Sequence, residues 1–264
     1  MCTIGAIITK QKRLLLFKNL DLTFHWDFPQ PITKQIGDMQ ALIFPSFADK
    51  PGLWAGINRF GLGIYGADGD AIFNRTGPEY GSPDLIRWCY QETLEQCRSV
   101  KEAYPFLINL YREHKIGCDG DIILLADPTE AVALEYAIVR WGLQFSGTGS
   151  YIFRTNLYTT LPHYAPMDTE NSRYMSHRKR FETLFDHLSR KSWHTDVDDL
   201  KAMLRDHTHG PGALSLCRHG GEGEFYTQAS NIMVYDQGKV DAYYILNNAP
   251  CKQEYEHLHV DWRP

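Results

Sequence analysis

Cys2 is the residue of this 264-residue chain that is most clearly suited to act as a nucleophile. Methionine aminopeptidases remove Met1 when the second residue is small, so we expect the mature chain to begin with Cys2. An α-amine with a pKa of about 7.7 to 8.0 is partly unprotonated near neutrality and can accept the thiol proton. The resulting thiolate can attack a carbonyl without a separate histidine. The alternative is that Cys2 is a small apolar residue at the start of a strand.

The sequence after Cys2 predicts a hairpin that returns to it. Two apolar runs, 4–9 and 14–17, flank a charged segment that is typical of a turn. In an antiparallel pair the second strand would bring Lys18 or Asp21 close to the start of the chain. A carboxylate near a terminal ammonium holds it by a charge-assisted hydrogen bond. Each charge taken alone is equally compatible with an ordinary turn.

Composition and charge exclude several classes of protein. With 43% hydrophobic and 13% aromatic residues, the chain is neither disordered nor fibrous. Lys and Arg total 27 against 32 Asp and Glu, a net charge of -5, so we expect no nucleic-acid partner. No apolar run approaches the roughly 20 residues that span a bilayer, so we expect no membrane partner.

The N-terminal segment and the cysteines favour a cytoplasmic location. A secretory signal begins with basic residues and continues with an apolar stretch, whereas here Lys10, Lys12 and Arg13 follow the apolar run. The cysteines form no CxxC pair and no disulfide-like framework, which favours free thiols. They are Cys2, Cys89, Cys97, Cys118, Cys217 and Cys251.

Helices are predicted in the middle and in the later part of the chain. Ser82 and Pro83 are a typical start, and Ser99 with Glu102 forms a potential capping box, with Pro105 expected to limit or kink that second helix. The segments from about 172 to 190 and from 196 to 205 are also predicted to be helical.

Strands are predicted in blocks on either side of these helices. They cover 4–9, 14–17, 53–57, 62–65, 121–126, 131–137, 151–155, 232–236 and 240–246. Several strands in succession, followed by several helices, are typical of antiparallel sheets that are covered by helices. Strands and helices that alternate would instead indicate a βαβ pattern. We therefore predict an α+β fold and a single domain over residues 1–264.

Several short motifs together resemble one enzyme superfamily. Met1-Cys2-Thr3 followed by Asn19-Leu20-Asp21 is similar to the choloylglycine hydrolases and penicillin V acylases, which are N-terminal-nucleophile (Ntn) hydrolases. Residues 56–63, 154–157 and 216–219 resemble the related acyl-coenzyme A:6-aminopenicillanic acid acyltransferases. The similarity extends over most of the chain, although each motif is short.

The resemblance implies an αββα sandwich, two stacked and mainly antiparallel sheets covered by helices. It also implies site roles: Cys2 as the nucleophile, Asp21 as the carboxylate that orients the amine, Asn156 as an oxyanion-stabilising or amine-positioning side chain, and Arg173 as an arginine beside the nucleophile. Asn58, within the 56–63 motif, and Lys18 are expected to position the substrate.

The chain departs from the bile-salt branch at two places. Lys18 stands where those enzymes usually carry arginine, so a bidentate contact is replaced by a point charge. The segment 64–68 holds no counterpart of their asparagine, so a backbone N–H would have to serve as an oxyanion donor. The cysteine is already second, so no propeptide is needed. These differences argue against bile salts or penicillin as the substrate.

The expected activity is hydrolysis of a linear, non-peptide C–N bond in a small-molecule amide through a Cys2 thioester. An amine that intercepts the thioester would make the protein an acyltransferase. We expect neither a cofactor nor a metal. Enzymes of this group commonly form dimers or tetramers, so a homo-oligomer is a further expectation.

Two other classes of function compete with this one. A metal site is one, because His207 with His209 and Cys217 with His219 have suitable donor atoms. The loop composition around His207 and the wide spacing disfavour a zinc site, and His257 and His259 are expected in a surface tail. The other is a non-catalytic binding protein of the same fold. A glutamine amidotransferase is disfavoured because Thr3 replaces the usual glycine after the cysteine and no Asn-Gly-Glu triplet is present.

Overall fold

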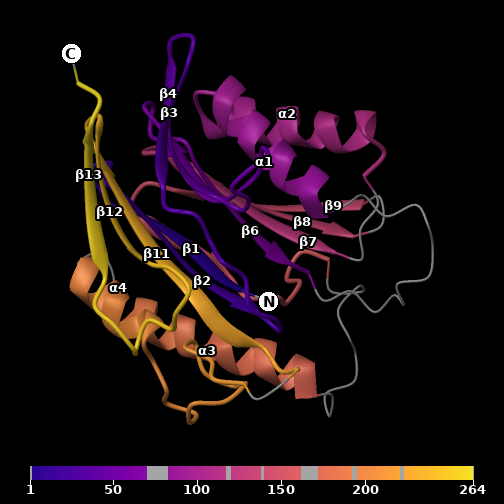
Figure 1. The fold of residues 1–264 in the computed structure, drawn as a ribbon, viewed down its shortest axis with the longest axis vertical. Helices are drawn as coiled ribbons and strands as arrows, with labels where there is room; N and C mark the ends of the chain where they lie inside the picture. The colour runs from indigo at the N-terminus through magenta and orange to yellow at the C-terminus, as the bar shows by residue number, and fades with distance from the viewer. Residues whose placement is uncertain are drawn as a thin grey trace.

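In the part of the chain that the structure describes, four layers form, with two β-sheets face to face and a pair of helices outside each sheet (Figure 1). The computed structural model describes residues 2–69, 83–116, 120–137, 140–161, 172–191, 195–220 and 223–263. The predicted α+β fold with an αββα sandwich is confirmed.

The first sheet carries the N-terminal hairpin at its centre. Its six strands are antiparallel and lie in the order β10-β1-β2-β11-β12-β13. They are β1 (Cys2–Ile8), β2 (Leu14–Leu22), β10 (Ser150–Arg154), β11 (Tyr226–Asp236), β12 (Lys239–Ile245) and β13 (Glu256–Asp261). The apolar run 14–17 is buried on both faces because the sheet is covered on both sides.

The second sheet is a seven-stranded antiparallel meander in chain order from β3 to β9. Its strands are β3 (Ile32–Ile36), β4 (Met39–Pro45), β5 (Leu53–Asn58), β6 (Gly63–Asp68), β7 (Asp121–Ala126), β8 (Glu130–Ala137) and β9 (Arg140–Gly147). Its inner face packs against the first sheet in the central hydrophobic core.

Each sheet has its own helices on the outer face (Figure 1). Helices α1 (Pro83–Gln96) and α2 (Val100–Glu113) cover the second sheet, and α3 (Ser172–Lys191) and α4 (Val197–Leu204) cover the first. The apolar stripe predicted for α3 packs onto the first sheet through buried Leu184 and Leu188.

The register of β1 and β2 determines which side chains surround Cys2. Leu20 lies opposite Cys2, and Lys18 lies opposite Ile4. Because side chains alternate along a strand, Cys2 and Lys18 point into the space between the sheets, whereas Thr3 and Asp21 point toward α3. The predicted return of the second strand beside Cys2 is confirmed.

Several sequence-based assignments need correction or completion. Helix α2 continues through Pro105 to Glu113, so Pro105 does not end the helix; the ring lies at an exposed position and removes only one intrahelical bond. Strands β3, β4, β9 and β13 were not predicted. His257 and His259 lie on β13 rather than in a tail. Ser82 lies outside the described residues.

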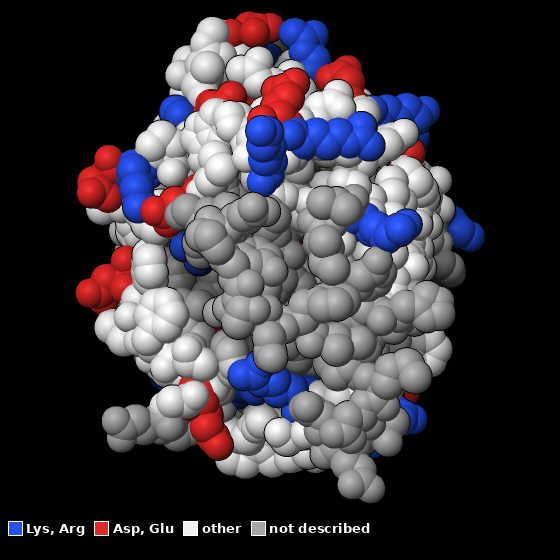
Figure 2. Space-filling model, turned by 90° about the vertical axis from the view of Figure 1, so that its right-hand side faces the viewer, with Lys and Arg blue, Asp and Glu red and all other residues white. Residues whose placement is uncertain are grey.

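Two observations concern the surface. None of the described helices is long and apolar enough to cross a lipid bilayer. On the face shown in Figure 2, the coloured acidic and basic side chains are interspersed around the edge rather than gathered by sign.

Candidate active site

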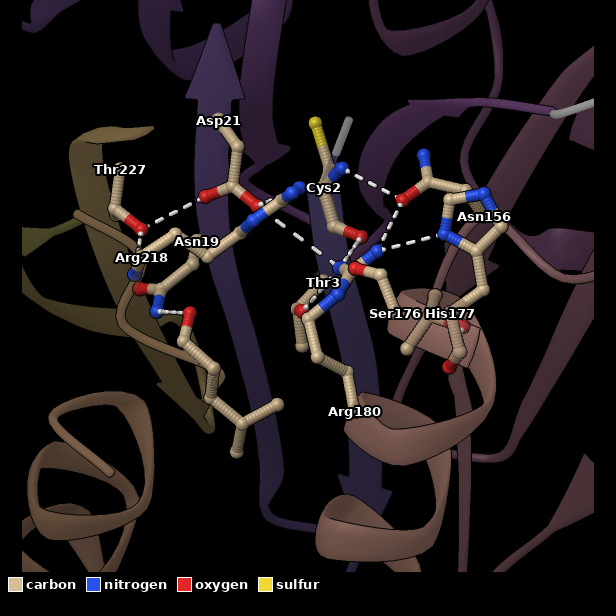
Figure 3. Close-up of polar contacts among 12 residues, drawn as sticks. Cys2, Thr3, Asn19, Asp21, Asn156, Ser176, His177, Arg180, Arg218 and Thr227 are labelled. Atoms are coloured by element: carbon tan, nitrogen blue, oxygen red, sulfur yellow. Dashed lines mark hydrogen bonds and ion pairs between the residues drawn. The ribbon is translucent and has the colours of Figure 1, made fainter. Parts of the chain in front are cut away.

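Cys2 begins the central strand β1 and is only 6% exposed. Its N–H donates to Oδ1 of Asn156 at 3.1 Å, and its carbonyl accepts from Nη1 of Arg180 at 3.0 Å. Figure 3 shows the thiol directed away from the Arg180 guanidinium. The main chain of Cys2 is therefore fixed on one side while its sulfur points to the other.

Asn156 follows β10 and is buried beside Cys2. Its Oδ1 accepts from both Cys2 N and Arg180 Nη2, the latter at 2.9 Å, while its Nδ2 donates to the Asp68 carbonyl at 2.6 Å. Two donors and one acceptor fix which way the amide points. Of the two roles expected for Asn156, the contact of Oδ1 with Cys2 N corresponds to positioning of that nitrogen, while one of the two Nδ2 hydrogens is used on the Asp68 carbonyl.

Arg180 is a fully buried arginine on α3 that connects the residues of the site. Besides Cys2 and Asn156, its guanidinium approaches Asp21 Oδ2 at 3.9 Å (Figure 3). Burial lowers the pKa of Arg180 to about 10, the nearby Arg218 adds to this effect, and Asp21 opposes it. The side chain remains a cation near neutrality, so it can act as a rigid charged donor.

Asp21 is fully buried on the helix-facing side of β2. Thr227 Oγ1 donates to its Oδ1 at 2.8 Å, and Arg218 Nη1 lies 3.6 Å from its Oδ2. One carboxylate thus lies between two buried arginines, Arg180 and Arg218, and offsets part of their positive charge. Through Arg180, Asp21 is linked to both Cys2 and Asn156.

Lys18 lies on the face of the sheet that carries the Cys2 thiol. Its Nζ donates to the carbonyls of Trp54 at 3.2 Å and Gly66 at 2.6 Å, both on the second sheet. Burial lowers the pKa of Lys18, whereas the negative charge of an ionised Cys2 would raise it. Lys18 thus places a buried ammonium near Cys2, and two of its three N–H groups hold it there.

Two predicted site residues are not brought to Cys2. Asn58 closes the β5–β6 turn: its Nδ2 donates to Leu94 O and Cys97 O at the end of α1, and its Oδ1 accepts from two turn N–H groups. All its bonding capacity is used there, so its expected role toward substrate is wrong. Arg173 lies exposed in the first turn of α3, and the arginine in contact with Cys2 is Arg180.

Sequence reasoning missed three residues of the site: Arg180, Arg218 and Thr227. A signal existed for Arg180, since His177 and Leu184 lie three residues before and four after it, on the same buried face of α3. Arg218 lies within the 216–219 motif, but nothing in that motif identifies its partner. Thr227 carries no distinguishing sequence signal.

Metal-ligating side chains gather elsewhere. In the part of the chain that the structure describes, three or more His, Cys, Asp or Glu residues in a geometry that could hold a metal ion occur at His207, Cys217, His219 and Cys251. Cys2 does not belong to this group.

Comparison with solved structures identifies the fold. The structure is similar to that of the C2A mutant of the conjugated bile acid hydrolase from Clostridium perfringens, with a TM-score of 0.57 and 14% identity. The match covers 99% of this chain and 92% of the hydrolase chain. A second structure of that hydrolase matches with a TM-score of 0.59 and 16% identity over 98% of this chain and 97% of that chain. This chain has the fold of the Ntn hydrolases.

Penicillin V acylase from Agrobacterium tumefaciens gives a similar result. The match covers 99% of this chain and 86% of the acylase chain, with a TM-score of 0.54 and 10% identity. No protein-family model and no curated protein match the sequence. The resemblance predicted from short motifs is therefore confirmed in the fold.

Proposed function

We propose that the protein is a cysteine-dependent Ntn amidohydrolase that cleaves a linear, non-peptide C–N bond after removal of Met1. The observation that carries the proposal is the hydrogen bond from Cys2 N to Asn156 Oδ1, supported by buried Arg180. That nitrogen becomes the α-amine when Met1 leaves. A base and a nucleophile on one residue, with the base held by a fixed acceptor, is what such chemistry requires.

The first step would form the nucleophile. The α-amine, whose pKa is ordinarily about 7.7 to 8.0, takes the proton of the Cys2 thiol directly or through a water. The buried ammonium of Lys18 favours the resulting thiolate because it lies on the same face of the sheet. Asn156 and Arg180 meanwhile hold the main chain of Cys2 from the opposite side.

The next steps would pass through a thioester. The thiolate attacks the amide carbon, and a backbone N–H would stabilise the tetrahedral oxyanion. The protonated amine gives its proton to the departing nitrogen, the C–N bond breaks, and an acyl thioester of Cys2 remains. Water, deprotonated by the same amine, then releases the carboxylic acid and regenerates the thiol. A primary amine in place of water would give acyl transfer, from the same intermediate.

Turnover of a panel of chromogenic N-acyl anilides of linear and aromatic acids tests the proposal. Cys2→Ala should lose all measurable turnover of any substrate that the wild type cleaves. Cys97→Ala is the matched control, because Cys97 is equally buried but lies by α1 in the outer core of the second sheet. Addition of hydroxylamine to the assay should trap the Cys2 thioester as a hydroxamate, which tests the intermediate that hydrolysis and acyl transfer share. Full activity in Cys2→Ala would overturn the proposal.

A further inference from the structure

A second group of reactive side chains joins three segments of the chain. His207 lies after α4, Cys217 and His219 lie in the segment before β11, and Cys251 lies in the turn after β12. Each offers one ligand atom, and the four atoms all lie within 4.8 Å of one another. Cys217 is buried, and the two histidines are half-buried, so three of the four are largely removed from solvent.

The close contacts within this group cannot all be hydrogen bonds at the same time. Nε2 of His219 lies 3.0 Å from Nε2 of His207, 3.1 Å from Sγ of Cys251 and 3.5 Å from Sγ of Cys217. One imidazole nitrogen has either one proton or one lone pair, so it cannot satisfy three partners at once. Around a tetrahedral zinc ion, with bonds of about 2.0 to 2.3 Å, ligand atoms are separated by roughly 3.3 to 3.8 Å. The separation between His219 and Cys217 lies in this range, whereas those from His219 to His207 and to Cys251 are shorter, so an ion would move these ligand atoms slightly apart.

We propose that His207, Cys217, His219 and Cys251 form a structural Zn²⁺ site of the Cys2His2 type. Two sulfur and two imidazole donors in a tetrahedral arrangement are the set that zinc prefers. Binding releases the two thiol protons to solvent, and the two thiolates then neutralise the dication. Four protein ligands leave no open position, so the ion would hold the fold together rather than take part in chemistry.

The position of the site gives it a role in the geometry around Asp21. Arg218 lies between the ligands Cys217 and His219; its N–H donates to Thr227 Oγ1 at 2.9 Å and its guanidinium approaches Asp21. Arg218 is covalently joined to both ligands, so an ion that fixes Cys217 and His219 also restrains the backbone of the arginine between them. The ion would therefore help to keep the Arg218 guanidinium next to the Asp21 carboxylate.

The sequence-based expectation of no metal rested on loop composition and spacing. Of the four candidate ligands in the sequence, His207, Cys217 and His219 belong to the group, but His209 does not. Its place is taken by Cys251, which lies 32 residues beyond His219 and is brought in by the β11–β12 hairpin.

Metal analysis of the purified chain tests the proposal without any assay of activity, so its outcome is separate from that of the hydrolase proposal. Protein purified under reducing conditions, without chelators and with zinc present, should retain one zinc per chain after gel filtration. Cys251→Ser and His207→Ala should lose it. His209→Ala is the matched control, because it removes an imidazole from the same loop but outside the group, and it should retain zinc.

Thermal unfolding provides the second measurement. Because a metal that binds only the folded state stabilises it, a strong chelator should lower the Tm of the wild type and of His209→Ala but leave that of Cys251→Ser unchanged. Wild-type protein without zinc after reconstitution would overturn the proposal. So would an isolated metal-free protein with Cys217 and Cys251 joined in a disulfide, or equal loss of zinc in His209→Ala and Cys251→Ser.

Discussion

Nη2 of Arg180 donates to Oδ1 of Asn156 at 2.9 Å, and the same oxygen accepts from Cys2 N at 3.1 Å. The acceptor that would orient the terminal amine is thus itself fixed by a buried cation. Arg180 in turn lies against Asp21, so the carboxylate, the arginine and the amide act on Cys2 as one connected unit.

This arrangement predicts a catalytic role for the Asn156 oxygen. Asn156→Ala should lower kcat by about 100-fold, the loss that a small misplacement of a reacting group can cause, with little change in KM. Steady-state kinetics on the best amide of the panel measure both constants. A change in KM alone would show that Asn156 binds substrate instead of orienting the amine.

Arg180 should also be essential for stability. Arg180→Met removes the buried hydrogen bonds to Cys2 O and Asn156 Oδ1, whereas Asp21 keeps Arg218 as a partner, so we expect a cost of about 1 to 3 kcal/mol. The free energy of unfolding in urea measures the loss. Arg178→Met is the control on the same helix: its ion pair with Glu182 is exposed, so the cost should be below about 1 kcal/mol. Equal costs would contradict the interpretation.

Asn58 should matter for stability and not for chemistry. Asn58→Ala removes the bonds to Leu94 O and Cys97 O and leaves buried N–H groups of the β5–β6 turn without an acceptor. We expect a loss of about 1 to 3 kcal/mol in unfolding free energy with kcat/KM unchanged for the folded protein. A selective loss of activity at full stability would restore the substrate role that the sequence suggested.

Asp121 should make stability depend on pH. Burial raises its pKa to about 6, although Tyr111 and Tyr90 donate to Oδ2 and oppose the shift. The folded state thus holds the proton more tightly than the unfolded chain, whose pKa is about 3.9. Below about pH 4 the carboxyl is protonated in both states and does not lower the free energy of unfolding. As the pH rises through about 6, ionisation favours the unfolded chain and the free energy of unfolding falls.

Comparison with Asp121→Asn measures that cost, since the amide oxygen can still accept from both tyrosines. The stability of the variant relative to wild type should rise between about pH 4 and pH 7 by up to ~3 kcal/mol. Urea unfolding at several pH values gives this difference. A difference that stays constant over that range would rule out a raised pKa for Asp121.

Local sequence patterns predicted the elements that carry the site but not the contacts between them. The β1–β2 hairpin follows from two apolar runs around charged residues, and α3 follows from a stripe of apolar residues. Strand β3, by contrast, is mostly exposed and polar, and β13 is an edge strand, so neither has a hydrophobic signal. Such strands form because a neighbour offers backbone partners, which a local pattern does not reveal.

In the candidate site, too, the sequence indicated what lies close along the chain and not what packs from a distance. Cys2 and Asp21 could be predicted because the hairpin brings them together over a short stretch of chain. Arg180 and Arg218 come from positions about 160 and 200 residues later in the chain, and their roles depend on how α3 and the segment before β11 pack against the first sheet. Arg173 was expected beside Cys2 from the resemblance alone, whereas the arginine that contacts Cys2 lies seven residues later, on the buried face of α3.

The central claim is that Cys2 becomes a terminal amine–thiol pair of unusual reactivity. A short, sub-stoichiometric iodoacetamide pulse at neutral pH, followed by peptide mass mapping, tests both parts at once. The account predicts that Met1 is absent and that Cys2 is labelled well ahead of the other five cysteines, including the exposed Cys251. Retention of Met1, or labelling of Cys2 no faster than that of the others, would contradict it.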